Sequence, residues 1–314
     1  MNGNDLRNLF VKSLSASLDK LSIAKNGEQL KDIFICPICL QKFNLKECLN
    51  ARDIISLEDV PPKALGGRPL TITCKNCNNS CGHDLDTYLV NEIRNGHKLL
   101  LSESQKQKGT ISVGTTELLG KFSIDLNSKS ISVTINENNN NPANIDDAKF
   151  NLKKAFEDQR SIDIKLKFTE QKRYPQVLIP SILKNAYLLA FHELGYRYIL
   201  RSNLDIIRRQ ILYPQQIILI SNPVIFQDEV FMQSFGDGVY KVSIGNQLCI
   251  GVIISLKLKE INIEHRFFVV LPDYMDEESR IYSDVLSKEQ GQKCSIIAKL
   301  NNRSYNKSDR IVQF

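Results

Sequence analysis

Apolar residues recur at intervals of three and four near the start of the chain, and this spacing predicts an amphipathic helix over residues 5–23. The apolar positions are Leu6, Leu9, Phe10, Leu14, Leu18 and Leu21. A helix with one apolar face needs a surface to cover. We therefore expect this helix to pack on another part of the chain or on a second subunit.

A second pattern follows, in which short apolar runs are separated by proline and glycine. Two adjacent prolines forbid regular strand pairing, and a Gly-Gly pair is typical of a turn. The predicted elements are a strand from Ile54, a loop at 60–62, a turn at 65–67, a strand over 69–73, and a helix that follows Cys77, is interrupted near Gly82 and ends at Asn95-Gly96. The predicted order is strand, turn, strand, helix.

The rest of the chain mixes both periodicities, which indicates an α+β fold. A polar stretch, SESQKQKG at 102–109, is typical of an interdomain linker and predicts two domains, residues 1–104 and 105–314. Alternation predicts strands at 162–168, 216–220, 239–244, 248–256 and 261–270, and helical spacing predicts helices at 146–159, 180–200 and 205–212. The asparagine-rich run at 136–144 is expected to be a loop.

Composition places the chain among ordinary globular proteins. Its 314 residues are 42% hydrophobic, which is enough for two cores. No apolar run approaches the ~18 to 20 residues of a membrane span, and the N-terminus lacks the layout of a signal peptide. We expect no membrane partner and a cytoplasmic location. The net charge of +6 is compatible with a polyanionic partner.

Eight cysteines carry the most specific chemical signal. Disulfides are rare in a reducing cytoplasm, and four of the cysteines form two Cys-x-x-Cys pairs, Cys36 with Cys39 and Cys74 with Cys77. Each pair can turn both thiolates to one side of a tight turn, as tetrahedral Zn²⁺ requires. A structural zinc is therefore predicted, and a redox dithiol is the alternative. The other four cysteines are expected to be mostly buried apolar residues: Cys48, Cys81, Cys249 and Cys294.

These motifs together resemble a known family. The pair CPIC and CKNC, the intervening LEDVPPKALGG and the asparagine directly after the last cysteine resemble the HNH nucleases with a ββα-metal fold and four-cysteine zinc. That family includes phage endonucleases that cleave branched DNA. The resemblance covers about residues 33–95 and implies that the N-terminal domain is an HNH-like ββα-metal domain, followed by a larger α+β domain.

The resemblance implies a second metal. Glu58 matches the family's metal-binding acid, Asn78 matches its helix-borne ligand, and oxygen ligands imply Mg²⁺ or Mn²⁺. Asp59 stands where the family has its histidine base, and a carboxylate of pKa ~3.9 is a weaker base than an imidazole of ~6.5. Three interpretations of Asp59 stay open: it is the base, it is a second metal ligand, or the site is inactive. In the second case, His83 is the candidate to supply the imidazole, as a metal ligand or as the base.

The function implied is a metal-dependent endonuclease that hydrolyses phosphodiester bonds of DNA. Lys63, Arg68 and Lys75 are expected to bind flanking phosphates. The larger domain would select substrate, sense a signalling nucleotide or protein regulator, or make a homo-oligomer, a plan that resembles nucleases of bacterial anti-phage defence and mobile elements. The alternative is a catalytically inactive zinc-binding module that binds nucleic acid or a protein partner.

Overall fold

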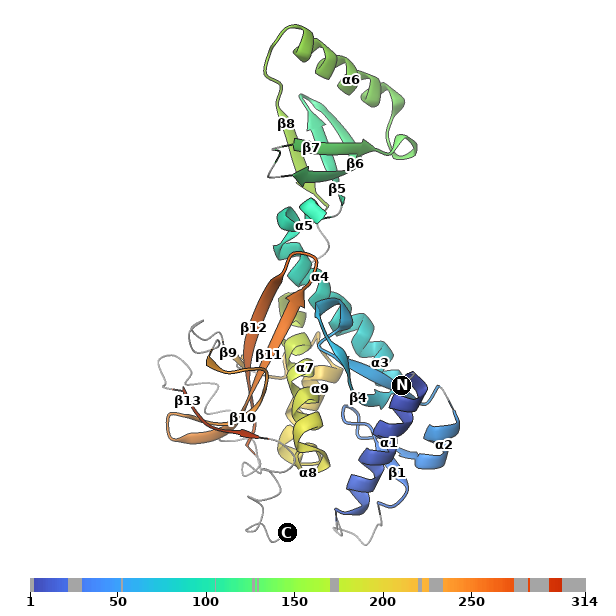
Figure 1. Ribbon diagram of the computed structural model, residues 1–314, viewed down its shortest axis with the longest axis vertical. Coiled ribbons are helices and arrows are strands. Elements are labelled where there is room, and N and C mark those ends of the chain that lie inside the picture. The colour runs from blue at the N-terminus through green and yellow to red at the C-terminus, as the bar shows by residue number, and fades with distance from the viewer. Residues whose placement is uncertain are drawn as a thin grey trace. The chain divides into compact units, whose positions relative to one another are not determined.

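The computed structural model has the predicted α+β composition (Figure 1). It describes residues 3–21, 30–51, 53–104, 106–125, 128, 130–169, 175–219, 222–225, 234–273, 282 and 294–300. Among these residues, none of the helices combines the length and the apolar character needed to cross a bilayer.

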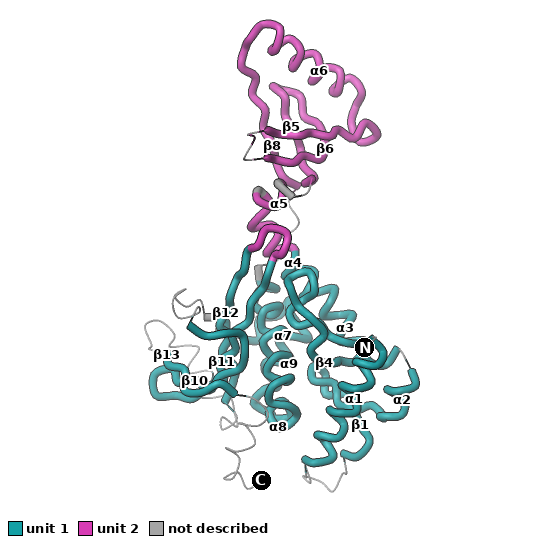
Figure 2. The backbone as a smooth tube through the Cα atoms, in the orientation of Figure 1, with its two compact units in different colours: residues 1–90, 174–257, 263–314 teal, residues 91–173, 258–262 magenta. Residues whose placement is uncertain are grey.

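The chain forms two compact units (Figure 2). The first comprises residues 1–90, 174–257 and 263–314, and the second comprises residues 91–173 and 258–262. This division differs from the predicted boundary after residue 104. The polar stretch at 102–109 does not act as a linker, because its start belongs to helix α5 (Lys98–Ser104) and its end to strand β5 (Gln107–Val113). The second unit is thus an insertion within the first.

The predicted N-terminal helix is confirmed. It is α1 (Gly3–Asp19), and it buries Val11 and Leu18 completely. Its apolar face lies against the small elements that follow it and the strands of the next hairpin. These small elements are β1 (Ile33–Ile35), which pairs with β2 (Lys42–Asn44), and α2 (Leu45–Asn50). The helix therefore covers a surface of its own chain.

The predicted order of strand, turn, strand and helix is also confirmed. The elements are β3 (Ile55–Val60), η1 (Lys63–Leu65), β4 (Arg68–Cys74), α3 (Lys75–Cys81), the π-helical turn η2 (Gly82–Asp86) and α4 (Thr87–Gly96). The Gly-Gly turn has a steric cause. Gly66 has φ +87°, in the left-handed region, and a Cβ on Gly67 would lie 1.5 Å from the Pro61 carbonyl oxygen. Only glycine fits these two positions without a shift of the backbone.

Helix α7 (Pro175–Leu194) is the core of the first unit. Every residue from 180 to 188 is buried. One side of the helix contacts the β3–β4 hairpin and η2, and it also contacts strands of the large sheet. The single helix predicted over 180–200 is divided at Gly195, whose φ of +70° separates α7 from α8 (Tyr196–Ile199). A short turn, η4 (Ser202–Leu204), then leads into the predicted helix α9 (Asp205–Leu212).

The large sheet of the first unit has five strands in the order β13-β10-β11-β12-β9 (Figure 1). Its strands are β9 (Val224–Ile225), β10 (Gly238–Ile244), β11 (Gln247–Leu258), β12 (Ile263–Leu271) and β13 (Cys294–Leu300). The predictions for β10, β11 and β12 are confirmed. Strand β10 pairs antiparallel with β11 and with β13. Since α7 contacts β9, β10 and β12 as well as the hairpin, it joins the sheet to the hairpin.

The strand predicted over 216–220 is wrong for its described residues, 216–219. Their backbone is held by one side chain instead of a neighbouring strand. Gln210 Oε1 accepts hydrogen bonds from the amides of Ile218 and Leu219, each at 3.0 Å, and Gln210 Nε2 donates to the Gln216 carbonyl at 2.9 Å. Ile217 is 85% exposed, so the apolar alternation does not mark a buried face.

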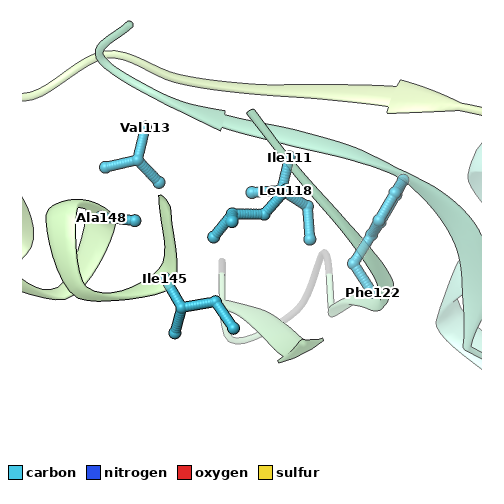
Figure 3. Packing of buried hydrophobic residues seen from close by; sticks show 6 residues of the cluster. All are labelled: Ile111, Val113, Leu118, Phe122, Ile145 and Ala148. Atoms are coloured by element: carbon cyan, nitrogen blue, oxygen red, sulfur yellow. The ribbon is translucent and has the colours of Figure 1, made fainter. Parts of the chain in front are cut away.

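The second unit is a four-stranded antiparallel sheet with one long helix. The strands lie in the order β7-β6-β5-β8, with β6 (Thr116–Asp125), β7 (Ser130–Ile135) and β8 (Ile164–Phe168), and the helix is α6 (Pro142–Glu157). The core contains Ile111, Val113, Leu118, Phe122, Ile145 and Ala148 (Figure 3). The asparagine-rich run forms η3 (Glu137–Asn139) and the start of α6, where Asn141 caps the helix.

The buried ring of Phe122 should stabilise this second core. Phe122 is fully buried and lies 5.0 Å from the Phe168 ring, so Phe122→Ala should cost about 3–5 kcal/mol. The control is Phe156→Ala, because the Phe156 side chain is 83% exposed. Amide hydrogen exchange across β5 and β6, measured in the full chain, should accelerate in the first variant alone. Equal exchange in the two variants would contradict this packing.

Candidate functional site

The four predicted cysteine ligands gather in one place. The sulfur atoms of Cys36, Cys39, Cys74 and Cys77 all lie within 4.8 Å of one another, and Cys39 Sγ is 3.8 Å from Cys74 Sγ. A tetrahedral zinc ion with Zn–S bonds of ~2.3 Å requires S···S distances of about 3.8 Å. The donor set and its spacing therefore fit a metal ion, and they are consistent with structural zinc.

Tight turns hold the two knuckles. In the first, the Leu40 amide donates to the Cys36 carbonyl at 2.9 Å, and Leu40 adopts a φ of +58°. In the second, Cys74 is the N-cap of α3, and its sulfur accepts a hydrogen bond from the Cys77 amide at 3.4 Å. The Cys74 amide donates to Cys36 Sγ at 3.4 Å and so links the knuckles. Such amide donors favour the thiolate form that a metal needs.

The remaining cysteines mostly behave as predicted. Cys48, Cys81 and Cys249 are buried, and Cys294 is half-buried on β13. Burial raises the pKa of Cys48 to about 11 and that of Cys81 to about 12. These thiols are therefore protonated near neutral pH.

Two buried tyrosines attach the first knuckle to the C-terminal helices. Tyr187 on α7 donates its hydroxyl hydrogen to the Pro37 carbonyl at 2.6 Å, and Tyr196 on α8 donates to the Ile35 carbonyl at 2.6 Å. The Ile35 amide in turn donates to the Tyr196 hydroxyl oxygen at 3.2 Å. The knuckle and α7 therefore belong to one packed core.

Glu58 and Asn78, which the resemblance pairs, lie in direct contact. Asn78 Nδ2 donates to Glu58 Oε2 at 2.7 Å and to the Leu57 carbonyl at 3.1 Å. Thr73 Oγ1 donates to the same carboxylate oxygen at 3.3 Å. Glu58 is only 2% exposed, so these hydrogen bonds compensate for lost hydration. Asn78 presents its amide hydrogens, not its oxygen, to Glu58.

A lysine from α7 completes the site, and sequence reasoning missed it. Lys184 is fully buried, and its ammonium donates to Glu58 Oε1 and, at 2.6 Å, to Asp86 Oδ2. We call Glu58, Asp86 and Lys184 the buried triad, in which Glu58 and Lys184 are buried and the Asp86 side chain is 18% exposed. The other carboxylate oxygen, Asp86 Oδ1, is buried and has no hydrogen-bond partner. Two carboxylates share one cation, so the ionised triad carries one uncompensated negative charge.

The charge balance explains the direction of each pKa shift. Burial opposes the ammonium of Lys184, but the Glu58 and Asp86 carboxylates outweigh burial and raise its pKa. Burial raises the pKa of Glu58 even though Lys184 favours the ionised form. Burial also raises the pKa of Asp86, and the charge of Asp59 adds to this effect. The triad therefore holds Lys184 protonated, with a tendency to take up one more proton.

The turn η2 places Asp86. A π turn uses about one residue more than an α turn, so residues after it occupy helix positions one step earlier. Asp86 follows Asn78 by eight residues in the sequence. Because the π turn contains one extra residue, Asp86 takes the position that the seventh residue would have in a regular α-helix, two turns along the same face. A regular helix would have given this position to Leu85, which is buried instead. Helical spacing in the sequence therefore did not indicate Asp86.

The other predicted residues differ in environment. Asp59 is half-exposed and follows Glu58 where the β3–β4 register shifts. His83 is 89% exposed and contacts Asp84 Oδ1 at 2.7 Å, whereas Glu58 is buried. The predicted phosphate-binding residues lie on η1, on β4 and at the start of α3: Lys63 and Arg68 are exposed and Lys75 is half-buried.

We call Glu58, Asn78 and Asp86 together the acid site. In this arrangement, Glu58 and Asn78 do not offer two free ligand atoms to a second metal ion. Both oxygens of Glu58 have donors, Asn78 presents its NH₂ group, and Lys184 already supplies a cation. Asp86 Oδ1 is the free buried acceptor. Across the described ranges, no second set of three or more His, Cys, Asp or Glu side chains gathers as closely as the four cysteines. Binding of Mg²⁺ or Mn²⁺ by Glu58 and Asn78 stays a prediction.

No family model matches this chain, and no curated protein or solved structure matches it significantly. The resemblance to HNH nucleases therefore depends on the residues and their geometry.

The cysteine group should determine the metal content. Cys39→Ser removes one of the four thiolates and should lower bound zinc from about one ion per chain to a small fraction, with loss of fold in the first 100 or so residues. Cys294→Ser is the control, because Cys294 is equally half-buried but lies outside the group. Zinc is measured by atomic emission on protein purified without added metal. Retention of zinc by the Cys39 variant would contradict the assignment.

Removal of the lysine should destabilise the fold. Lys184→Met leaves the buried Glu58 and the half-buried Asp86 carboxylates without a cation, which typically costs about 3–5 kcal/mol, whereas Lys149→Met on an exposed helix face should change stability by less than about 0.5 kcal/mol. The free energy of unfolding is measured in urea by tyrosine fluorescence, since the chain has no tryptophan.

The cost of Lys184→Met should also depend on pH. The folded variant binds protons at Glu58 and Asp86 more tightly than the unfolded chain, because burial raises both pKa values. Without Lys184 these pKa values rise further than in the parent, so the stability of the variant increases more steeply as pH falls, and its difference from the parent should narrow as pH is lowered from neutral toward the ordinary carboxyl range. A cost that stays constant over this range would mean that the two carboxylates are not charged in the variant.

Proposed function

We propose that this chain is a metal-dependent endonuclease that hydrolyses phosphodiester bonds of DNA and holds a structural Zn²⁺ through its four cysteines. The observation that carries the proposal is the 2.7 Å contact between Asn78 and Glu58. It brings together the two residues that match the HNH pattern, on a hairpin and helix that the cysteine group joins to the first knuckle. Mg²⁺ or Mn²⁺, when bound, would stabilise charge on the scissile phosphate.

Residues of the chain take the other roles. Asn78 orients the Glu58 carboxylate. Asp59, half-exposed and next to Glu58 in the chain, is the better candidate base, because the exposed His83 contacts Asp84 instead. A carboxylate is in general a weaker base than an imidazole, which implies a slow reaction near neutral pH. Lys63, Arg68 and Lys75 would bind phosphates on either side of the cleaved bond.

The buried triad sets a condition on this chemistry. Glu58 and Lys184 are buried, so a phosphate reaches them only if Lys184 releases Glu58 and the site opens. The contact between Lys184 and Glu58 also favours a second candidate function, a catalytically inactive zinc module that binds nucleic acid or a protein partner. In that case Lys184 permanently neutralises Glu58, and Asp59 marks the loss of the histidine base.

We place the protein in the cytoplasm, where a reducing environment keeps thiolates available to metal; all eight cysteines are free of disulfides. The part of the chain outside the cysteine group and hairpin would select substrate, bind a signalling nucleotide or protein regulator, or form a homo-oligomer. A role in anti-phage defence or in a mobile element would suit a DNA endonuclease of this plan.

Cleavage assays separate the two candidate functions. The parent chain should nick or cut plasmid DNA with Mn²⁺ or Mg²⁺, and Glu58→Gln and Asn78→Ala should each lower the rate by about 10²- to 10⁴-fold. Asn79→Ala is the matched control, since Asn79 is the exposed neighbour of Asn78 on the same helix. Zinc content is measured on every variant to exclude loss of the fold.

Two results would overturn the nuclease proposal. One is a parent chain, fully loaded with zinc, that cleaves neither supercoiled nor branched DNA with any divalent metal. The other is cleavage that Glu58→Gln and Asn78→Ala leave unchanged, because the activity would then come from elsewhere. The first result would support the inactive zinc module.

A further inference from the structure

The two faces of the sheet in the second unit differ in chemistry. Residues directly opposite one another in antiparallel strands point to the same face, and successive residues alternate. Ile111 and Phe122 belong to the face that packs against α6 (Figure 3). The other face is mostly polar, with one exposed apolar side chain, Leu119, opposite Thr110. We call it the lysine face and define it by Lys108, Thr110, Lys121, Thr134, Lys165 and Lys167.

The register places these residues side by side. Lys108 lies directly opposite Lys121, and Thr110 lies opposite Lys167 on the neighbouring strand. Lys121 is also opposite Thr134. The four lysines are all exposed. They form a cluster that runs across β8, β5 and β6, with hydroxyl groups between the charges.

The lysines of the lysine face are not paired with carboxylates among the described residues. Like charges directly opposite on a sheet are destabilising, yet Lys108 and Lys121 are paired in this way. In the described part of the chain, none of the four lysines forms a salt bridge with a carboxylate. The acids of the same face, Glu117 and Asp125, lie toward the two ends of β6. The charge therefore favours a polyanionic partner.

The lack of aromatic side chains among the described residues of the lysine face helps to identify which polyanion it would bind. Proteins that bind single-stranded nucleic acid on a sheet stack the bases on aromatic side chains. The described residues of the lysine face include no aromatic residue, whereas lysines and hydroxyls contact phosphates without reading bases. Strands can also lie in a groove of duplex DNA.

We propose that the lysine face binds the sugar-phosphate backbone of double-stranded DNA. The four lysines contact phosphates and the threonine hydroxyls donate to phosphate oxygens. Four neutralised phosphates would contribute about −3.6 to the slope of log affinity against log salt. Binding by this face requires nothing of the acid site, so it holds for an active nuclease and for an inactive module alike.

The test compares two variants of the full chain, each with two charges removed. Lys108→Gln with Lys121→Gln alters the lysine face, and Lys149→Gln with Lys153→Gln alters exposed positions on α6. Binding to a labelled 30-base-pair duplex of mixed sequence is measured by fluorescence anisotropy over a range of salt, without Mg²⁺ or Mn²⁺. The first variant should bind on the order of tenfold or more weakly, and its salt slope should fall by about 2. The α6 variant should bind within about twofold of the parent.

Three results would overturn the proposal. They are a parent that does not bind the duplex, an equal loss in the α6 variant, and tighter binding of single-stranded DNA or duplex RNA than of duplex DNA. Amide hydrogen exchange across β5 and β6 confirms that both variants keep the sheet. Cleavage is measured separately, so loss of binding and loss of catalysis are distinguishable.

Discussion

The buried triad of Glu58, Asp86 and Lys184 is the contact on which the first unit depends. Glu58 and Lys184 are buried and Asp86 is half-buried, so all three groups lose hydration, and this cost is offset only while Lys184 stays in contact with both carboxylates. The ammonium contacts both carboxylates, and Asn78 and Thr73 satisfy the remaining oxygen of Glu58. A shift of α7 relative to the hairpin would leave charges buried without partners. The triad therefore fixes the position of this helix.

The same helix connects the triad to the four-cysteine group and to the large sheet. Three positions after Lys184, Tyr187 donates to the first cysteine knuckle, and other faces of α7 contact strands of the five-stranded sheet. The cysteine group, the triad and the sheet are therefore connected through one buried helix. Opening of the acid site for a phosphate would disturb all three, and this connection explains why Lys184 separates the two candidate functions.

Local chemistry predicted a large part of this structure. Cysteine spacing, the Gly66-Gly67 turn and the order of strand, turn, strand and helix depend on neighbouring residues, so the sequence alone predicted them. Asp86 and Lys184 depend on other causes. The extra residue of a π turn places Asp86, and Lys184 reaches Glu58 from 126 residues away in the chain. The insertion of the second unit depends on the return of the chain to the first unit at α7, which no local pattern indicates.

The protonation state of Lys184 tests the triad most directly. Nitrogen-15 NMR of the lysine side chains, with Lys184 assigned from a Lys184→Arg variant, reports both its charge and the exchange of its protons with water. We predict a protonated ammonium that exchanges slowly at neutral pH and titrates above the ordinary value of ~10.4. A neutral amine near pH 7, or an ammonium that exchanges as fast as the exposed Lys106, would contradict the triad.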